Sequence, residues 1–545
     1  MVGSTHRKLL RTYPFDKNGW SIMKRDIDQR APSESEVLGA SKAGLSMNGK
    51  TSFMESGASL LVASVFGNGM NYFFMLFLAR QLGAEDFGIY ALGVTMFNTL
   101  LLVAMAGVDT GAIKFVSEYR AQGQAEAARR AIATAVVLVT GLGLIAALGL
   151  LLSATPLSVQ LYGKPGLTSV LLWFALALPC GLLGSLLLSS MQAMQTVRYT
   201  VAIKYLWEPI GKWMLAGLAL WGGFGLGGVT FGLALTFAIS AALAIGALMR
   251  RGWLTARDFT GIERQEVRAF GAFCLPLVAA NIFGVLAPRA DIMILGYWAS
   301  SHDVGLYLVA FQTAAILALI LGAFDVVFAP TISRAWAAKD LATFQESYEL
   351  VHRVALAASM PLCVLLVLFA GDVLSVFGVE FAAAGPILTI LTIGHLVNAS
   401  SGCANTVLLM SGHSRVVLVN TVVYGAILIG ITALMIPLWG PVGAACAASG
   451  SFVLLNGLRV AQVWRLHRML PWTWAAVKPL MAGCVMGLMI WLVKPHLSPL
   501  AYVPVGLLAC GVYIAVLRVA RLEADDALIL SALATRIRVA AGWAR

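Results

Sequence analysis

The stretch AIATAVVLVTGLGLIAALGLLLS, residues 131–153, decides the fold class because it contains no charged residue. A helix of this length can cross the hydrocarbon core of a bilayer, which requires about 20 mostly apolar residues. The whole chain has the same character, since 59% of its 545 residues are hydrophobic and only 12% are charged. Soluble domains are typically about 45–50% apolar and about 25% charged. The sequence therefore predicts an all-α integral membrane protein.

About fourteen apolar runs in the chain are long enough to be transmembrane helices. An even number of spans places both termini on the same side of the membrane. The predicted spans are residues 58–80, 87–110, 129–153, 167–191, 201–222, 226–250, 272–297, 304–329, 354–377, 384–411, 414–437, 441–463, 474–494 and 499–519.

The positions of lysine and arginine predict the orientation. Most of the 38 Lys and Arg residues lie in the two termini and in the loops after even-numbered spans, as Arg250 and Arg251 do. The opposite side carries Arg80, Lys164 and Lys494. By the positive-inside rule both termini are cytoplasmic. The net charge of +12 is then explained by orientation and by attraction to anionic lipid headgroups, so we expect no nucleic-acid partner.

The chain contains an internal repeat. Residues 87–90, FGIY, recur as VGLY at residues 304–307, and Arg198 recurs as Arg415 at the same offset. Each repeat holds an even number of spans, so the two copies have the same orientation, as in the parallel repeats of some transporters. We expect two six-helix lobes followed by two extra C-terminal helices.

These patterns predict a domain organisation with a disordered cytoplasmic tail before the first lobe and an amphipathic cytoplasmic tail after the last span. The predicted boundaries are 1–55 for the N-terminal tail, 56–250 for the N-lobe, 251–271 for a cytoplasmic linker, 272–465 for the C-lobe, 466–520 for spans thirteen and fourteen, and 521–545 for the C-terminal tail.

Several motifs resemble those of one family. Residues 78–90, LARQLGAEDFGIY, resemble a segment of polysaccharide flippases, and residues 289–296, RADIMILG, resemble the motif of that family's seventh span. Residues 410–415, MSGHSR, and 437–445, PLWGPVGAA, resemble its later signatures. Over about residues 55–470 the chain thus resembles the Wzx-type flippases, in the polysaccharide transporter family of the multidrug/oligosaccharidyl-lipid/polysaccharide exporter superfamily.

The resemblance implies a transporter rather than an enzyme. Its substrate would be an undecaprenyl-pyrophosphate-linked oligosaccharide, moved across the bacterial inner membrane for O-antigen, capsule or exopolysaccharide synthesis. The implied partners are this lipid-linked oligosaccharide, membrane lipids, and a polymerase with its export machinery. No cofactor is implied, and coupling to protons or sodium stays open.

Three alternatives are weighed against this function. A cation-coupled multidrug antiporter of the same superfamily would favour an acidic, apolar cavity over cations at mid-membrane. A polytopic glycan polymerase or ligase would need a sizeable outward loop, and the longest one here runs only from about Pro156 to Gly166. A lipid II flippase shares the need for cations, and the sequence separates it only weakly from the leading function.

Two cations within predicted spans are the main candidates for substrate binding. Lys212 lies about 16 Å into span five, and Arg289 lies about 12 Å from the outer end of span seven, at 1.5 Å per residue. Charges at this depth are costly and usually face a polar path, and both side chains can bind a pyrophosphate. The competing interpretation is pairing with Glu208, four residues before Lys212, or with Asp291, two residues after Arg289.

Other polar residues in the spans are weaker candidates. Coupling or gating could involve the carboxylates Asp291, Glu208, Asp109 and Asp325, and sugar hydroxyls could be bound by Asn68, Asn71, Asn281, His395 and Asn398. For each of them, interhelical hydrogen bonding is the competing interpretation. No metal site is expected, because the seven cysteines lie in apolar runs without a CxxC pair.

Overall fold

The computed structural model describes residues 47–194, 196–496, 498 and 501–520, and the side chains of these residues except 47–62, 276–288 and 326–327. All regular elements in these ranges are helices, and ten of them are long and apolar enough to cross a membrane. This confirms the all-α membrane fold, while the number of fourteen spans stays a prediction. Both predicted terminal tails lie largely outside the described residues. Residues 1–61 and 62–545 form two separate units, and the helix packing and the candidate site belong to the second.

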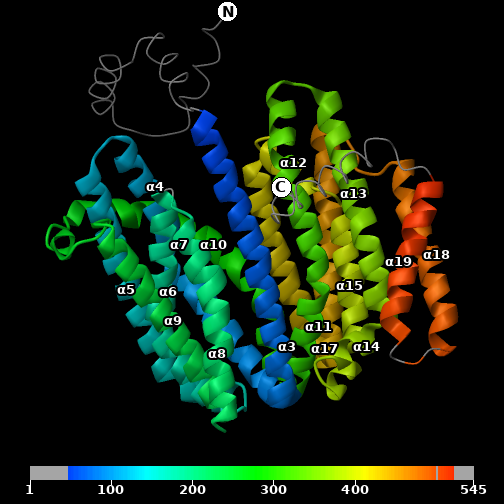
Figure 1. The fold of residues 1–545 in the computed structure, drawn as a ribbon, viewed down its shortest axis with the longest axis horizontal. Coiled ribbons are helices and arrows are strands. Elements are labelled where there is room, and N and C mark those ends of the chain that lie inside the picture. Colours follow the sequence, from blue (N-terminus) through cyan, green and yellow to red (C-terminus); the bar gives the residue numbers. More distant parts are fainter. Residues whose placement is uncertain (1–46, 195, 497, 499–500, 521–545) are drawn as a thin grey trace, which may run out of the picture. The chain divides into compact units, whose positions relative to one another are not determined.

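Residues 62–250 form a set of packed helices that we name the N-terminal group (Figure 1). Helix α6 packs against α5 and α9, α4 packs against α5 and α6, and α8 packs against α9. The elements are α3 (Met47–Met105), α4 (Val108–Ala121), α5 (Ala125–Thr155), the π-helix η2 (Pro156–Leu161), α6 (Gly166–Ala193), α7 (Arg198–Thr200), the π-helix η3 (Val201–Trp207), α8 (Glu208–Trp221) and α9 (Gly225–Arg250).

Residues 290–519 form a second set, the C-terminal group, in which α13 packs against α12, α15 and α18, and α17 packs against α10 and α15. Its elements and those leading into it are η4 (Ala256–Phe259), α10 (Arg264–Trp298), α11 (Ser301–Ala314), α12 (Ile316–Ala337), α13 (Leu341–Leu368), α14 (Ala370–Ser375), η5 (Val379–Ala384), α15 (Gly385–Ser400), α16 (Ala404–Met410), α17 (Ser414–His467), η6 (Trp474–Ala476), α18 (Val477–Val493), η7 (Lys494–His496) and α19 (Tyr502–Val519).

Two of the longest helices are interrupted at a glycine. In α3 the backbone leaves helical geometry at Gly83, with φ 72° and ψ 173°, and in α17 it does so at Gly440, with φ 55° and ψ −133°. Glycine adopts such positive φ values without the steric penalty of a Cβ atom. The break in α3 falls between predicted spans one and two, and the break in α17 falls between predicted spans eleven and twelve.

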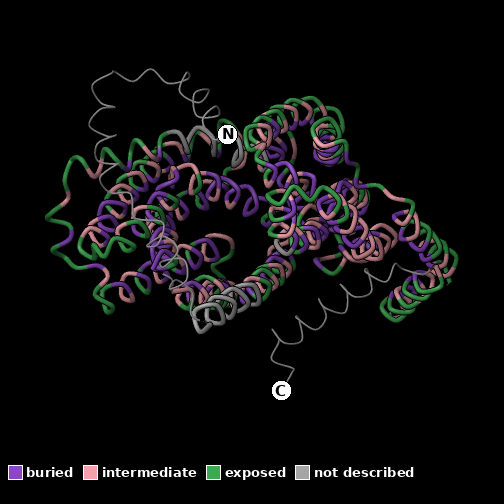
Figure 2. The backbone as a smooth tube through the Cα atoms, turned by 90° about the horizontal axis from the view of Figure 1, so that it is seen from above, coloured by how far each residue is buried: buried purple, intermediate pink, exposed green. Residues whose placement is uncertain are grey.

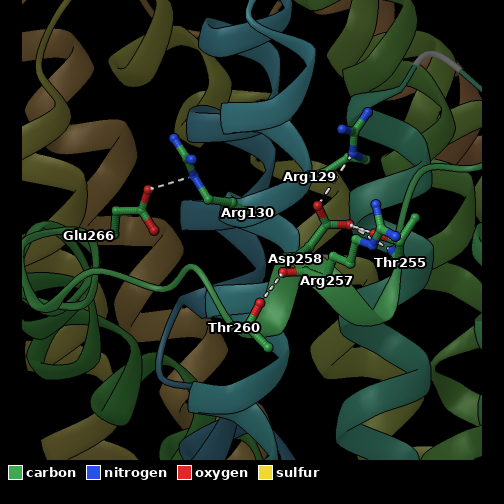
Figure 3. A network of polar contacts seen from close by, with 7 residues as sticks. All are labelled: Arg129, Arg130, Thr255, Arg257, Asp258, Thr260 and Glu266. Atoms are coloured by element: carbon green, nitrogen blue, oxygen red, sulfur yellow. Dashed lines mark hydrogen bonds and ion pairs between the residues drawn. The ribbon is translucent and has the colours of Figure 1, made fainter.

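The predicted cytoplasmic linker is fastened to α5 by two neighbouring arginines (Figure 3). Arg129 Nε lies 3.4 Å from Asp258 Oδ1, and the other oxygen of Asp258 accepts the backbone N–H of Thr255 at 2.7 Å. Arg130 Nε lies 3.3 Å from Glu266 Oε1, at the start of α10. These contacts tie η4 and the beginning of α10 to the N-terminal group.

Burial follows the pattern expected for a chain surrounded by lipid. Buried residues lie where helices meet and exposed residues lie on their outward faces (Figure 2). Phe87 and Tyr307 are fully buried in a core that contains residues of both groups. Ile145 and Leu152, by contrast, are more than two-thirds exposed on α5 although they are apolar. In a membrane protein the acyl chains of the lipids cover such residues.

Candidate functional site

Lys212 of α8 is half-buried and faces α3. Its ammonium donates a long hydrogen bond of 3.4 Å to Asn71 Oδ1, and it lies 5.7 Å from the centre of the Phe237 ring. The Asn71 amide is oriented by its own hydrogen bond of 2.9 Å to the carbonyl oxygen of Gly67. The structure thus brings together two residues, Lys212 and Asn71, that the sequence predicts separately.

Glu208 does not neutralise Lys212 in the way that its spacing suggests. Among the described residues the ion pairs do not include one between Glu208 and Lys212. An interval of four residues allows such a pair on a helix, yet the lysine side chain extends toward Asn71 instead. The simple intrahelical salt bridge is therefore not observed.

Asp291 is occupied by a partner that its sequence neighbours do not indicate. It is 2% exposed, and the hydroxyl of Tyr307 donates to its Oδ2 at 2.5 Å. The backbone N–H of Ile292 donates to Oδ1 at 2.8 Å. Tyr307 belongs to the VGLY repeat anchor, and this is the only signal in the sequence that singles it out. The Asp291–Tyr307 bond joins α10 to α11.

Arg289, two residues before Asp291, is half-buried. Within the described part of the chain it has neither an ion pair nor a hydrogen bond with Asp291. Residues two apart on a helix point in different directions, which accounts for the separation. The guanidinium therefore carries its charge at the predicted mid-membrane depth without a carboxylate partner among these residues.

Asn398 of α15 takes part in an interhelical network of the C-terminal group. The Asn456 amide donates to Asn398 Oδ1 at 2.9 Å, and the Ser401 hydroxyl donates to Asn456 Oδ1 at 3.1 Å. Arg459 Nη1 donates to the same oxygen at 3.5 Å. Hydrogen bonding between helices therefore describes Asn398 as observed, which is the competing interpretation.

The two carboxylates near the predicted cytoplasmic ends have different environments. Asp109 accepts the backbone N–H of its neighbour Thr110 at 2.8 Å, which is a contact within one turn of α4. Asp325 of α12 accepts the hydroxyl of Thr406 of α16 at 3.0 Å and so joins two helices. Neither forms an ion pair with a loop arginine in the described residues.

The remaining predicted residues do not converge on one place. His395 is 5% exposed, its ring packs 5.2 Å from that of Phe452, and neither ring nitrogen has a partner in the described chain. Asn68 is exposed on α3, and the Asn281 side chain lies outside the described residues. No group of three or more His, Cys, Asp or Glu residues that could hold a metal occurs in the part searched.

Comparison with known proteins places these features in a family. Residues 53–336, more than half of the chain, match the family model described as polysaccharide biosynthesis protein. A curated relative from Haloferax volcanii, described as the probable low-salt glycan biosynthesis flippase Agl15, is 25% identical over 411 residues. The match covers 73% of this chain and 81% of that protein.

Solved structures show the same fold at low sequence identity. The lipid II flippase MurJ in an inward closed conformation matches 84% of this chain and 97% of its own, with a TM-score of 0.68 and 14% identity. The MATE transporter VcmN of Vibrio cholerae matches 76% of this chain and 97% of its own, with a TM-score of 0.52 and 17% identity. These comparisons confirm the family resemblance drawn from the sequence motifs. The chain is a member of the polysaccharide biosynthesis protein family, with the fold of the multidrug/oligosaccharidyl-lipid/polysaccharide exporter superfamily.

Proposed function

We propose that this chain is a flippase for undecaprenyl-pyrophosphate-linked oligosaccharide repeat units, serving O-antigen, capsule or exopolysaccharide synthesis in the bacterial inner membrane. The family match and the glycan-flippase description of the Haloferax volcanii relative support transport of a lipid-linked glycan. The pyrophosphate carrier, the bacterial inner membrane and the cytoplasmic termini are the finer parts of the proposal. A polymerase and export machinery would receive the product.

The observation that carries the proposal is the state of Arg289. Its only nearby carboxylate in sequence, Asp291, is buried and hydrogen-bonded to Tyr307 at 2.5 Å. A cation within the membrane is costly unless it meets an anion or a polar path. A translocated pyrophosphate would provide the anion, and a guanidinium can bind it through two parallel hydrogen bonds.

Lys212 supports the same proposal from the N-terminal group. Its long bond to a neutral amide, Asn71, leaves most of the hydrogen-bonding capacity of the ammonium unused. An ammonium acts as a point charge that follows a moving phosphate without a fixed geometry. The two cations would therefore share the pyrophosphate, while amides such as Asn71 would contact the glycan.

No enzymatic step or cofactor is part of this proposal, and the energy source would be a proton or sodium gradient. Of the four carboxylates predicted for coupling, three are engaged in hydrogen bonds, namely Asp291, Asp109 and Asp325. Glu208 is the one without a hydrogen bond among the described residues, one turn before Lys212. We therefore assign the coupling role to Glu208 within the proposal.

The test compares Arg289→Ala, Arg289→Lys and a control, Arg80→Ala, whose side chain is exposed. Loss of one charge-assisted contact costs about 1.5–3 kcal/mol, so binding of undecaprenyl pyrophosphate to purified protein should weaken roughly ten- to a hundredfold. Arg289→Lys should recover part of this binding because the charge remains and the fork is lost.

The same three variants should be scored for surface polysaccharide in cells that depend on this chain, at matched protein levels in the membrane. We expect loss of export for Arg289→Ala and normal export for Arg80→Ala. Normal export and unchanged binding by Arg289→Ala would remove the basis of the proposal. Efflux of cationic dyes with no effect on polysaccharide would favour the antiporter alternative instead.

A further inference from the structure

The N-terminal and C-terminal groups meet backbone to backbone at their predicted outer ends. A Cβ atom on Gly88 of α3 would lie 1.7 Å from the carbonyl oxygen of Ser301, and one on Gly305 of α11 would lie 2.3 Å from that of Ala84. Gly88 and Gly305 are equivalent positions of the repeat anchors FGIY and VGLY. Only glycine permits this approach, because any side chain at either position would force the groups apart.

Glu380 of η5 reaches across the same seam, between the two groups. Its Oε1 accepts the backbone N–H of Ala84 at 2.7 Å, directly after the Gly83 break. The first N–H groups of a helical segment have no partner within the helix, and the carboxylate supplies one. Beside it, the rings of Phe87 and Phe381 lie 6.1 Å apart and fill the seam with apolar atoms.

Lys164 makes the reverse crossing, from the N-terminal group to the end of α10. Its ammonium donates to the carbonyl oxygens of Gly296 at 2.6 Å and Ala299 at 2.9 Å. The last carbonyls of a helix lack partners and carry partial negative charge, so a lysine is favourable there. Burial lowers the pKa of Lys164 and the charge of Asp303 partly opposes this shift.

Lys494 offers a matched comparison because it caps a helix in the same way without joining the groups. It donates to the carbonyl oxygen of Leu368 at 2.6 Å, near the end of α13, and to Asp372 Oδ2 at 2.7 Å. Both partners and Lys494 itself belong to the C-terminal group. Movement of one group against the other would break the bonds of Lys164 and would leave those of Lys494 intact.

We propose that Lys164 and Glu380 form a latch that holds the outer end shut over the Gly88–Gly305 contact. Opening toward the outer side requires both sets of hydrogen bonds to break. The latch rests on the proposed transport function only in that a transported substrate must leave through this end. Its strength sets how often the outer end opens, with or without substrate.

The test measures opening directly, by labelling a cysteine in the seam with a membrane-impermeant maleimide. Ser301→Cys is nearly isosteric and its site is 9% exposed, so it reports opening in a full-length chain whose seven native cysteines are replaced. In intact cells Lys164→Met should be labelled several-fold faster than the parent. Lys494→Met should be labelled at the parental rate.

A second pair of variants tests the glycine contact without touching any charge. Gly88→Ala places a methyl group against the Ser301 carbonyl, whereas Gly217→Ala in α8 has nothing within 4 Å of its new methyl. We expect fast labelling of the first and parental labelling of the second. Parental rates in both Lys164→Met and Gly88→Ala would overturn the latch. Fast labelling of Lys494→Met would also overturn it, because loss of any helix cap would then open the seam.

These measurements are independent of the glycan, since the labelling reaction needs no substrate. Arg289→Ala in the same background should be labelled at the parental rate. If Arg289→Ala exports normally while Lys164→Met labels faster, the flippase proposal fails and the latch stands. If Arg289→Ala loses export while all variants label alike, the latch fails and the flippase proposal stands.

Discussion

The two helix groups keep polar residues in the membrane in opposite ways. In the C-terminal group these side chains are mostly satisfied by one another, as in the Asp291–Tyr307 bond of 2.5 Å and the Asn456–Asn398 bond of 2.9 Å. In the N-terminal group, Lys212 has one bond of 3.4 Å to Asn71. Arg289, on the helix that contacts both groups, has no carboxylate partner among the described residues.

This difference separates residues that hold the fold from residues that are available to a ligand. A buried polar group with a short, well-placed partner stabilises the helices that it joins. A charged group without such a partner keeps its free energy of desolvation unmet until a ligand arrives. Membrane depth alone therefore does not identify a binding residue, and the partner of each side chain must be known.

The largest effect on stability is expected from Asp291→Ala. The change leaves the buried hydroxyl of Tyr307 without its acceptor, which costs about 1–3 kcal/mol. The melting temperature of the protein in nanodiscs should fall. The double variant Asp291→Ala/Tyr307→Phe should regain part of the loss because no buried polar group is left over. An unchanged melting temperature together with lost export would move Asp291 from the structural class to the ligand class.

Lys212→Met should show the opposite behaviour. The protein should melt at the parental temperature, because only one long hydrogen bond is lost. Binding of undecaprenyl pyrophosphate should weaken about tenfold, equivalent to about 1.4 kcal/mol. Lys212→Arg should retain most of the binding since the positive charge is kept. A drop in melting temperature as large as that of Asp291→Ala would erase the contrast between the two groups.

Asn398→Ala should cost about 1 kcal/mol of stability, the typical value of one internal hydrogen bond. Export should change only as far as the protein level does, which immunoblotting of membranes can establish. Asn71→Ala is its counterpart in the N-terminal group and should leave stability nearly unchanged. If Asn398→Ala lowers export at full protein level, then Asn398 contacts the glycan as the sequence predicts.

The smallest effect is expected in the linker, outside the contrast between the groups. Arg129→Met removes an ion pair of 3.4 Å whose arginine is partly exposed, and such pairs contribute about 0.2–1 kcal/mol. Thermal unfolding in low and high salt should show a small loss that shrinks as salt screens the charges. A loss that is large and independent of salt would mean that Asp258 has a larger structural role than its contacts indicate.

The sequence predicts the fold class well because apolar run length and charge bias report directly on the surrounding solvent. Runs such as residues 131–153 appear as helices, and the predicted turns at Gly83 and Gly440 appear as breaks in α3 and α17. The sites are a different matter. Asn71 and Lys212 are each predicted, but nothing in the sequence pairs them across α3 and α8.

By itself, then, the sequence determines that this is a helical membrane protein of the polysaccharide biosynthesis protein family, since hydropathy and local motifs need no partner to be read. Tertiary structure alone decides that Asp291 bonds to Tyr307 rather than to Arg289, and that Lys164 and Lys494 cap different helices. The physical reason is that a hydrogen bond depends on distances of a few ångströms between residues far apart in the chain. Hydrophobicity is a property of each segment, whereas partnership is a property of the packed molecule.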